Sequence, residues 1–554
     1  MSASDKKKLR KEQVAEQLTA RQRQEQAEAK KLMLYTTIFV TIMTIVLCLA
    51  VAILAVRGVK QSGIAQRNTV AATVGGEELS SVELSYYYVD YIQEFYNQWT
   101  SQYSSYADSY LLATMGLDTT LPLDEQTDPQ SGQTWAQHFL NEALSTAQND
   151  YALYNEAKQN GFTLPAEEQE MLDSAINNLD TYATIYGYTN ADKFLQASYG
   201  YGSSAKSYSA YLERSTIADA YYAFKEESFT YDDAALREFE KDNMDKYNSY
   251  TYDSVYMSYT AFLTGGTTNE EGETTYTDEE RDAARAAVKE AADKLATATT
   301  LEELKTLAAE IETADASEVA VSENKDQLYT AINGDLSAWL AEDARQDGDI
   351  ATIANASTST DEDGNETTTI NGYYVALFHS VNDNKISTSN VRHLLVKFPN
   401  GIEDEETGEI VYTDEDKAEA KELADGYLQE WKAGEATEES FIQLVKDHSE
   451  DTSASEGGLF ENIHPGSSYV ENFLNWSIDA NRKAGDAEVI ETEYGYHVMY
   501  YVGVSELNYR DYMIAEEKRA LDVAAWYDAL LDATVAAMGD TSKMDLGLTL
   551  SPTY

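Results

Sequence analysis

The sequence predicts an α+β multidomain protein with a single transmembrane helix, a mainly α-helical module, two tandem α+β domains and a C-terminal helix. Three observations lead to this prediction. They are a long uncharged apolar stretch near the N-terminus, a region in which aromatic residues recur at helical spacing, and an internal repeat in the second half of the chain. At 554 residues the chain is long enough for several domains, each with its own core.

The apolar stretch runs from Leu32 to Val56 and contains 25 residues without a charge. As a helix, this stretch is long enough to cross a hydrocarbon core of about 30 Å. A cleaved signal peptide is the alternative, but its apolar region is usually only about 7–15 residues long. No small-residue cleavage site follows Val56. We therefore expect an uncleaved transmembrane helix at residues 32–56, followed by a linker at residues 57–68.

The charges beside the apolar stretch predict its orientation. Residues 1–31 carry nine Lys and Arg residues against five acidic ones. The positive-inside rule keeps such a basic segment in the cytoplasm. We therefore expect a single-pass protein of the cell membrane whose N-terminus is cytoplasmic and whose bulk is extracytoplasmic.

The part after the apolar stretch is strongly acidic. Residues 1–60 hold 11 of the 40 basic and five of the 97 acidic residues, which leaves a net charge of −63 on the remainder. This charge excludes nucleic acid as a natural partner, because it repels phosphates. Cys48, the only cysteine, lies inside the apolar stretch, so the exported part has no disulfide, thiolate metal site or cysteine nucleophile.

Residues 69–249 are expected to form the mainly helical module. The module opens with a strand that a Gly75-Gly76 turn closes, and a helix then starts at Ser80 or Ser81. Two interpretations of the aromatic face of this helix stay open: core packing, and a groove that binds unfolded polypeptide. The face consists of Leu84, Tyr88, Tyr91, Phe95 and Trp99.

The second half of the chain contains a diverged repeat. The segment Gly-Glu-Thr-Thr-Tyr-Thr-Asp-Glu at Gly272 matches Gly-Glu-Ile-Val-Tyr-Thr-Asp-Glu at Gly408, an offset of 136 residues. Further matches follow the same order along the chain, at Val255 and Val391, Trp339 and Trp476, and Gly372 and Gly495. We therefore predict two copies of one α+β domain, at residues 250–382 and 388–504, each with the order strand-helix-helix-strand.

Local signals mark helix starts in both copies and in the tail. Thr277 and Thr413 are each followed closely by acidic residues, a pattern typical of helix N-termini. Residues 505–554 are expected to form a C-terminal region with a long amphipathic helix from about Glu506 to Met538. We expect this helix to pack back on the helical module.

The second copy carries a set of sequence motifs. They are Val391-Arg-His-Leu-Leu-Val-Lys, the segment from Phe441 to Ala454, Gly457-Gly-Leu, Pro465-Gly followed by two aromatic residues, and Thr492-Glu-Tyr-Gly-Tyr-His-Val. In combination these motifs resemble the parvulin-type peptidyl-prolyl cis-trans isomerases across the whole copy. The resemblance implies an enzyme of this type. Its catalytic residues would be His393, Asp451 and His497, and its substrate-binding residues would be Leu459, Tyr469, Phe473 and Thr492.

The resemblance also implies what these residues do. The two histidines would form a hydrogen-bond network at the centre of the sheet, with Thr492 as a further partner, and Asp451 would act electrostatically near the twisting bond. The other three would form a cup for proline. No cofactor and no metal is implied, and the sequence contains neither an HExxH nor a GxSxG motif.

This sequence departs from the parvulin pattern in places. Many relatives have methionine at the position of Tyr469, and the usual aspartate after the glycine pair is absent, since Leu459 follows Gly458 directly. In the first copy, Met257 stands at the position of His393 and Tyr374 at that of His497. We therefore expect the first copy to be a degenerate, catalytically silent domain.

The remaining histidines are not assigned to the site. We expect His448 and His464 to be surface or loop residues, while His138 and His379 lie outside the matched segments.

The whole arrangement resembles the SurA/PrsA-like foldases of bacterial envelopes. The resemblance implies a membrane-anchored foldase that binds newly exported, unfolded polypeptides and isomerises their X-Pro bonds. A non-enzymatic holdase, which uses both copies only for binding, is the alternative. A surface adhesin would explain the anchor and the charge but not the paired histidines.

Overall fold

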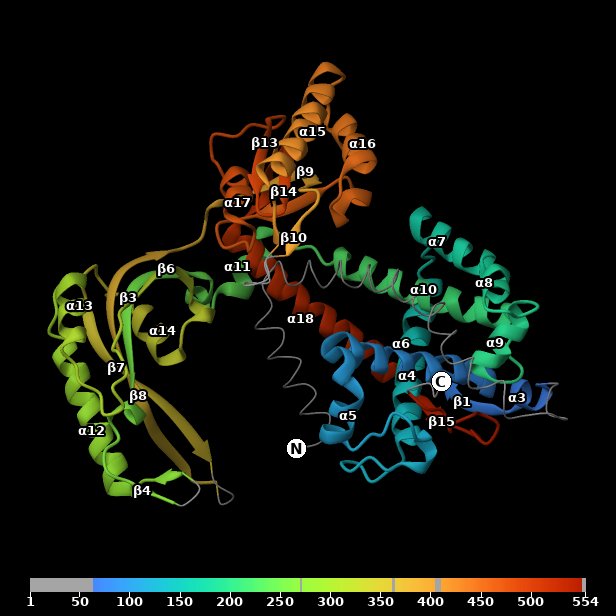
Figure 1. The fold of residues 1–554 in the computed structure, drawn as a ribbon, viewed down its shortest axis with the longest axis horizontal. Helices are drawn as coiled ribbons and strands as arrows, with labels where there is room; N and C mark the ends of the chain where they lie inside the picture. The colour runs from blue at the N-terminus through green and yellow to red at the C-terminus, as the bar shows by residue number, and fades with distance from the viewer. Residues whose placement is uncertain (1–62, 270–271, 361–363, 404–409, 551–554) are drawn as a thin grey trace. The chain divides into compact units, whose positions relative to one another are not determined.

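The computed structural model describes residues 63–269, 272–360, 364–403 and 410–550. The described chain separates into two compact units (Figure 1). Residues 63–230 and 518–550 form the helical unit, and residues 231–517 form the two-sheet unit. The transmembrane helix predicted at residues 32–56 lies outside the described residues. Within the described ranges, no helix is both long enough and apolar enough to cross a bilayer.

The helical unit is built around three long helices that pack on one another, α4, α6 and α10. Its elements are α3 (Ile64–Asn68), β1 (Val70–Val74), β2 (Glu77–Ser80), α4 (Ser81–Tyr103), η1 (Ser104–Tyr106), α5 (Ala107–Met115), η2 (Leu123–Glu125), α6 (Trp135–Gln159), α7 (Ala166–Asn177), α8 (Leu179–Ile185), α9 (Ala191–Tyr199), α10 (Ala205–Ser228), the C-terminal part of α18 (Tyr509–Ala533) and β15 (Ala536–Met538).

The predicted start of this unit is confirmed. β1 and β2 pair as an antiparallel hairpin across Gly75 and Gly76, whose positive φ angles suit a tight turn. α4 begins at Ser81 with Ser80 as its N-cap, and the side chains of Ser80 and Glu83 form a capping box.

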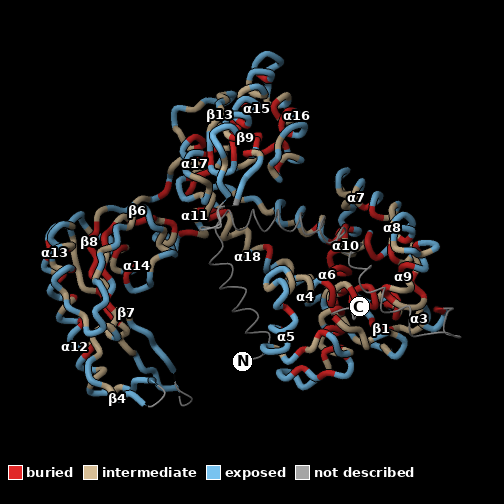
Figure 2. Tube along the Cα trace, viewed as in Figure 1, coloured by how far each residue is buried: buried red, intermediate tan, exposed pale blue. Residues whose placement is uncertain are grey.

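The aromatic face of α4 is divided between core and surface. Leu84 and Tyr88 are fully buried in the central apolar cluster, whereas Tyr91 and Phe95 are only partly buried against it. Trp99 lies beyond that cluster, near the end of the helix, and is also partly exposed. Core packing therefore accounts for the N-terminal half of the face, where buried residues concentrate along the inner sides of the helices (Figure 2).

The C-terminal region returns to the helical unit. The rings of Trp526 and Tyr527 on α18 pack on Tyr221 and Tyr222 of α10. The predicted helix from about residue 506 to 538 is shorter at both ends, because β14 continues to residue 508 and α18 ends at residue 533. Residues 536–538 instead form β15, which pairs with β1 as a third strand.

The two-sheet unit contains two four-stranded antiparallel sheets, which follow α11 (Asp233–Glu240) and η3 (Met244–Tyr247). The first copy comprises β3 (Ser249–Ser258), η4 (Tyr259–Phe262), β4 (Thr267–Thr268), β5 (Thr274–Thr275), α12 (Asp278–Leu295), α13 (Leu301–Ala309), β6 (Ser322–Leu328), η5 (Tyr329–Ala331), α14 (Gly334–Leu340), β7 (Ile350–Thr360) and β8 (Glu366–Asn382). The second comprises β9 (Ser387–Lys397), β10 (Ile402–Glu403), β11 (Ile410–Val411), α15 (Asp414–Ala433), α16 (Glu438–His448), η6 (Thr452–Glu456), β12 (Leu459–Ile463), α17 (Glu471–Ser477), β13 (Ala487–Thr492) and β14 (Gly495–Asn508).

The two copies share one strand order. The sheets run β6-β3-β8-β7 and β12-β9-β14-β13, and every neighbouring pair is antiparallel. In each copy two helices cover one face, α12 and α13 or α15 and α16, and a short helix, α14 or α17, covers the other. The helix starts predicted at Thr277 and Thr413 are confirmed, because both threonines form capping boxes.

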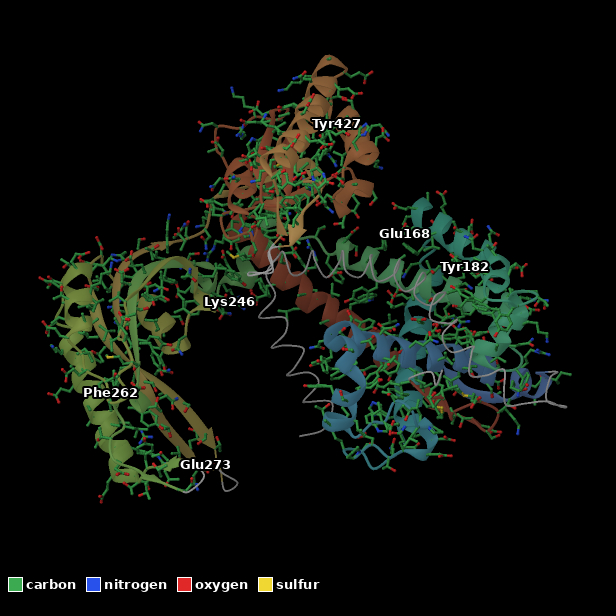
Figure 3. The ribbon with its side chains drawn as sticks, in the orientation of Figure 1. Glu168, Tyr182, Lys246, Phe262, Glu273 and Tyr427 are labelled. Carbon is green, nitrogen blue, oxygen red and sulfur yellow. The ribbon has the colours of Figure 1, made fainter. Side chains whose placement is uncertain are left out.

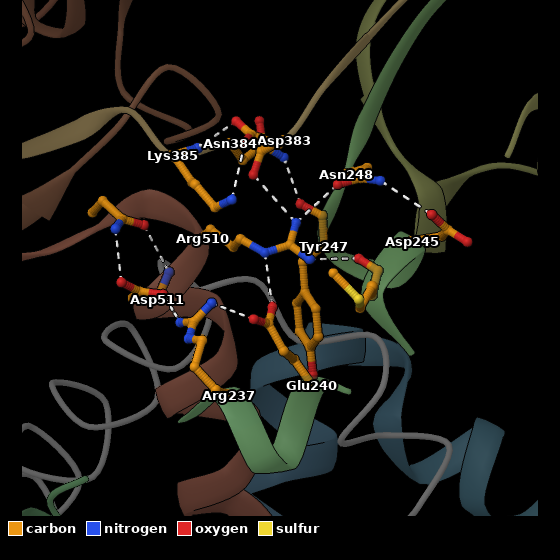
Figure 4. A network of polar contacts seen from close by, with 12 residues as sticks. Arg237, Glu240, Asp245, Tyr247, Asn248, Asp383, Asn384, Lys385, Arg510 and Asp511 are labelled. Carbon is orange, nitrogen blue, oxygen red and sulfur yellow. Dashed lines mark hydrogen bonds and ion pairs between the residues drawn. The ribbon is translucent and has the colours of Figure 1, made fainter. Parts of the chain in front are cut away.

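A buried arginine joins the segments that enter and leave the two sheets (Figure 4). Arg510, at the start of α18, is 3% exposed. Its guanidinium donates to the Glu240 carboxylate at 2.8 Å, to the Asn248 side chain at 2.8 Å and to the main-chain oxygens of Met244 and Asp383. This side chain therefore holds together α11, the entry to β3, the connection between the copies, and α18.

Candidate functional site

Two histidines lie side by side at the centre of the second sheet. His393 is on β9 and His497 on the neighbouring strand β14, two positions apart in register, so both side chains point to the face covered by α17. They are 2% and 5% exposed. Their Nδ1 atoms are 2.9 Å apart, so one nitrogen donates a hydrogen bond and the other accepts it.

Each ring has a further partner on its outer nitrogen. Thr492 Oγ lies 2.8 Å from Nε2 of His497. On the other side, Nε2 of His393 lies 3.6 Å from Oδ1 of Asp451 and 3.4 Å from the hydroxyl oxygen of Ser453. The polar groups therefore form a continuous line across the sheet, from Thr492 through both imidazoles to Asp451.

Asp451 supplies the charged end of this line. It follows α16 and caps η6, where its Oδ1 accepts hydrogen bonds from the main-chain nitrogen of Ser453 at 2.9 Å and from the Ser453 hydroxyl at 2.6 Å. Burial by itself raises the pKa of Asp451, but its contacts with His393 and these hydrogen bonds outweigh burial and hold the pKa well below the usual range. The carboxylate is therefore ionised at neutral pH.

The other end of the line is neutral. Burial, and after it the neighbouring His393, lowers the pKa of His497 to about 3. A neutral His497 carries one N–H, so one of its ring nitrogens donates a hydrogen bond and the other accepts one. The ionised Asp451 carboxylate lies beside Nε2 of His393 and attracts a proton on that nitrogen.

An aromatic cup stands over the histidines. Its three rings are Phe460 from β12, Phe473 from α17 and Tyr469 from the loop before α17. Their centroids are 5.2–5.8 Å from one another, and those of Phe460 and Phe473 are 4.9 and 5.4 Å from the ring of His393. An apolar floor and wall of this kind suits a small apolar ring, such as that of proline.

Comparison with known proteins identifies the family of the domain that contains the two histidines. The sequence model of the PPIC-type PPIase domain, also called rotamase, matches residues 393–503. This range begins at the first histidine and contains the second, the aspartate and all three aromatic rings. Residues 393–503 are a parvulin-type peptidyl-prolyl isomerase domain. The protein is therefore a peptidyl-prolyl cis-trans isomerase of the parvulin type.

Three solved structures are similar to parts of the chain. The PPIase domain of TbPar42 is 29% identical, with 21% of this chain and 98% of that one covered and a TM-score of 0.17. PrsA from Bacillus anthracis is 20% identical, with 27% and 59% covered and a TM-score of 0.16. PrsA from Bacillus subtilis is 14% identical, with 74% and 90% covered and a TM-score of 0.24. No curated protein matches the chain.

The structure brings together six of the seven residues predicted for the isomerase site, and Leu459 is the exception. Leu459 pairs with Arg392 on β9, whereas the next residue, Phe460, pairs with Val391. Opposed residues of antiparallel strands share a face, so Leu459 points with Arg392 away from the histidines. Phe460 is the cup residue that the sequence analysis missed. The alternation of side chains between the two faces of β12 could have identified Phe460, because neighbouring residues of a strand point to opposite faces.

The glycine pair before β12 holds the isomerase site against β9. Gly458 has a φ of +66°, and a Cβ at this position would lie 2.2 Å from the main-chain oxygen of His393. Its own carbonyl accepts the main-chain N–H of His393 at 3.0 Å. Glycine at this position therefore allows the close backbone approach that fixes His393 beneath Phe460.

A matched pair of variants tests which residue forms the cup of the isomerase domain. Phe460→Ala removes one aromatic wall, and we expect kcat/KM for a proline peptide to fall roughly tenfold, the effect of about 1.4 kcal/mol of lost binding. Leu459→Ala, one position away on the opposite face, should change kcat/KM by less than about twofold. Steady-state isomerisation kinetics measure both, and the reverse ranking would restore Leu459 to the cup.

His464 is a loop residue, as expected, but it is buried. It lies between β12 and α17, it is only 6% exposed, and its ring stacks on Tyr509 at 3.8 Å. Its Nδ1 accepts the main-chain N–H of Gly466 at 3.1 Å, and burial lowers its pKa to about 4. His448 is exposed, as expected, and stacks on Tyr427 of α15, which Figure 3 labels.

The first copy lacks the polar line of the isomerase domain. Equivalent positions follow from a shared pair of main-chain hydrogen bonds, between Phe378 and residues 348–349 in the first copy and between Tyr501 and residues 485–486 in the second. Four residues earlier on each strand, Tyr374 matches His497, as the sequence predicted.

The predicted match of Met257 to His393 is wrong. Tyr374 pairs with Tyr256 on β3, whereas His497 pairs with Leu395 on β9, so the residue equivalent to His393 is Ser254. Met257 belongs to the apolar cluster on the opposite face, beneath α12. Both histidines are nevertheless absent from the first copy, and Ser254 there accepts a hydrogen bond from Asn324 at 3.1 Å.

Acidification should destabilise the isomerase domain. His497 and His464, with pKa values of about 3 and about 4, titrate at about 6.5 in an unfolded chain. Between the folded-state pKa values and about pH 6.5, the unfolded state therefore binds more protons than the folded state. The stability that the two neutral rings contribute is complete above about pH 7 and is lost as the pH falls.

The helical unit should respond in the opposite direction. Burial raises the pKa of Asp90 to about 7 and that of Asp150 to about 8, whereas an unfolded aspartate titrates at about 3.9. The folded unit binds more protons in this window, so its stability should rise as the pH falls from about 8 to about 4. Denaturant unfolding of the whole chain at several pH values measures both transitions. Asp150→Asn should reduce the pH dependence of stability in the helical unit only. If the stabilities of both units changed with pH in the same direction, the assignment would be contradicted.

Proposed function

We propose that the protein is a membrane-anchored extracytoplasmic foldase whose isomerase domain acts on X-Pro bonds in newly exported, unfolded polypeptides. The observation that carries the proposal is the buried histidine pair beneath an aromatic cup, with an ionised carboxylate at its edge. The uncharged stretch at residues 32–56 and its basic flank support the anchor and its orientation. The separate helical unit supplies surface for binding a client outside the isomerase site.

In this proposal the cup receives the proline ring of the client. Phe460, Tyr469 and Phe473 offer apolar and edge-to-face contacts, so the ring is removed from water while the chain on either side stays in solvent. Such contacts hold the proline while the preceding carbonyl group rotates. Binding then favours whichever geometry of the amide fits the cup best.

The barrier to isomerisation is about 20 kcal/mol and comes from amide resonance, which is lost as the C–N bond twists. Resonance places partial negative charge on the carbonyl oxygen. A quarter of the Asp451 side chain is exposed beside the cup. The negative charge of the Asp451 carboxylate would repel the partial negative charge on the carbonyl oxygen of the planar amide. The planar amide is thereby raised in energy relative to the twisted one, and each 1.36 kcal/mol of this preference gives about a tenfold rate increase.

The histidine pair has a supporting role in this mechanism. Both rings are buried and hydrogen-bonded to each other, so the pair offers a fixed, water-free surface beneath the twisting bond. His393 also holds Asp451 through the contact at its Nε2. The reaction breaks no covalent bond, so none of these residues needs to transfer a proton.

A refolding experiment tests the proposal. The whole chain, in membranes or detergent, should accelerate the slow, proline-limited refolding phase of an unfolded client and should also slow that client's aggregation. Acceleration without any effect on aggregation would leave an isomerase with no separate client-binding function. Suppressed aggregation without acceleration would indicate the non-enzymatic holdase. Protease added outside intact cells should digest both described units, and their full protection would contradict the exported orientation.

A further inference from the structure

The end of α4 and the neighbouring α5 carry a cluster of aromatic rings at the surface of the helical unit. Trp99 and Tyr103 stack at 5.3 Å with an angle of 17° between their planes, and Tyr103 and Tyr110 stack at 4.1 Å with an angle of 16°. Trp99 and Tyr110 also contact each other, with their ring centroids 5.6 Å apart. Phe95 connects the cluster to the core, because its ring contacts both Trp99 and the buried Phe139. We call Phe95, Trp99, Tyr103 and Tyr110 the aromatic ladder.

Local backbone geometry creates this arrangement. α4 ends at residue 103, and Ser104, with a φ of +50°, reverses the chain into η1. α5 then packs beside the end of α4, which brings Tyr110 against Tyr103 (Figure 1). Rings that stack outside a core gain little from burial, so packing alone gives a weak reason for this ladder.

The chain segment that follows α4 exposes several large apolar side chains. Four large apolar side chains within 16 residues of one another are exposed: Tyr106 at 74%, Tyr110 at 39%, Leu112 at 52% and Leu121 at 47%. They all belong to the segment that begins directly after α4. Clustered exposure of this kind marks interaction surfaces, whereas single exposed apolar side chains are ordinary.

The chain around the ladder carries acidic residues only. Residues 91–125 contain five acidic residues and neither a lysine nor an arginine. One of these carboxylates, Asp108 on α5, accepts a hydrogen bond at 3.0 Å from Tyr96, three residues before Trp99 on α4. Aromatic faces beside carboxylates attract guanidinium and ammonium groups, through cation–π contacts and through charge.

We propose that the aromatic ladder binds extended, unfolded polypeptide segments in which arginine or lysine alternates with aromatic or aliphatic residues. The cations contact the ring faces and the surrounding carboxylates, while the apolar side chains cover the exposed residues of the following segment. This inference rests on the proposed client-binding function but not on the isomerase site. It specifies the chemistry of the client segment and the surface that selects it.

Fluorescence anisotropy on the whole chain tests the proposal. The probe is a labelled, unstructured peptide of repeated Arg-Leu-Ser triplets, and its matched partner has glutamate in place of arginine. We expect the arginine peptide to bind roughly tenfold or more tightly than the glutamate peptide, and its affinity to fall as salt is added. Equal affinity for the two peptides would overturn the cationic specificity.

Variants locate the binding surface. Trp99→Ala with Tyr110→Ala should weaken the arginine peptide roughly tenfold, since each ring contributes a contact of this class. Asp108→Asn should weaken it less and should reduce its salt dependence. Tyr427→Ala is the matched control, because Tyr427 is a half-buried surface tyrosine stacked on a histidine in the two-sheet unit, and it should change nothing. Trp99→Phe with Tyr110→Phe, which keeps both rings, should retain most of the affinity.

The outcomes separate this inference from the proposed function. If the ladder variant binds the peptide as well as the unaltered chain does, the ladder assignment is wrong while client binding stands. If the unaltered chain binds neither peptide nor a permanently unfolded protein, client binding itself fails. A ladder variant that alters the oligomeric state rather than peptide affinity would assign the surface to a second copy of the chain and overturn the proposal. Circular dichroism of each variant confirms that the helical unit is folded.

Discussion

Replacing both His393 and His497 with alanine should lower kcat/KM for a proline peptide roughly a hundredfold, equivalent to about 2.7 kcal/mol of lost transition-state stabilisation. The change removes the floor of the cup and leaves Asp451 without the Nε2 contact that orients it. Water can then enter beneath the amide and screen the carboxylate. Isomerisation kinetics on the whole chain measure the loss.

The first copy provides a matched control. Ser254 and Tyr374 occupy the positions equivalent to His393 and His497, in a sheet of the same strand order. Ser254→Ala with Tyr374→Ala should leave kcat/KM unchanged, because the first copy lacks the polar line. A loss of activity in this control would show that the first copy also contributes to catalysis.

Stability has to be measured alongside activity. Removing a buried hydrogen-bonded pair can cost about 1–3 kcal/mol of folding free energy, so circular dichroism must establish that the histidine variant is folded. We expect the folded variant to keep most of its suppression of client aggregation, because that activity is assigned to the helical unit. Full isomerase activity in the folded variant would contradict the site. Complete loss of aggregation suppression would contradict the division of labour between the units.

Replacing Arg510 with alanine should destabilise the two-sheet unit by about 3 kcal/mol. The change leaves Arg237 as the remaining cation beside the Glu240 carboxylate, and it removes the donors that Arg510 supplies to the main-chain oxygens of Met244 and Asp383 (Figure 4). The cost is large because Arg510 and Glu240 are both almost completely buried. Denaturant unfolding of the whole chain measures the difference.

Lys385 offers a control in the same region. Its ion pair with Asp383, at 3.2 Å, joins two side chains that are more than half exposed. Lys385→Ala should therefore cost less than about 1 kcal/mol. Arg510→Met combined with Glu240→Leu should recover part of the stability lost in Arg510→Ala, because the buried carboxylate is removed together with its partner and Arg237 keeps its ion pair with Asp511. Equal effects of Arg510→Ala and Lys385→Ala would show that the buried network does not hold the segments together.

Local signals in the sequence were sufficient for the helix starts and for the pattern of the repeat. Thr277 and Thr413 cap their helices with their own side chains and a neighbour three residues on, an interaction that depends only on adjacent residues. The paired histidines were also predictable, because each stands in a motif of the isomerase family and at the centre of an apolar strand. The transmembrane helix stays a prediction, since it lies outside the described residues.

Strand register was decided only by the tertiary structure. The motifs predicted Leu459 in the cup and Met257 at the position of His393, and in both cases the observed strand pairing places the side chain on the other face. A shift of one residue, or of any odd number, reverses the facing of a strand, and local sequence gives little information about such a shift. The glycine contact that fixes β12 joins residues 65 positions apart in the chain.

Length, charge, the repeat and the histidine motifs were thus determined by the sequence alone, because each depends on composition or on neighbouring residues. The Arg510 network and the aromatic ladder were determined by the fold. Arg510 bonds to Glu240, which is 270 residues away in the chain. Tyr110 reaches Tyr103 only because Ser104 adopts a positive φ. The Arg510 network depends on chain segments that are distant in sequence and meet in space, and the aromatic ladder depends on local backbone geometry. Neither can be read directly from the order of the residues.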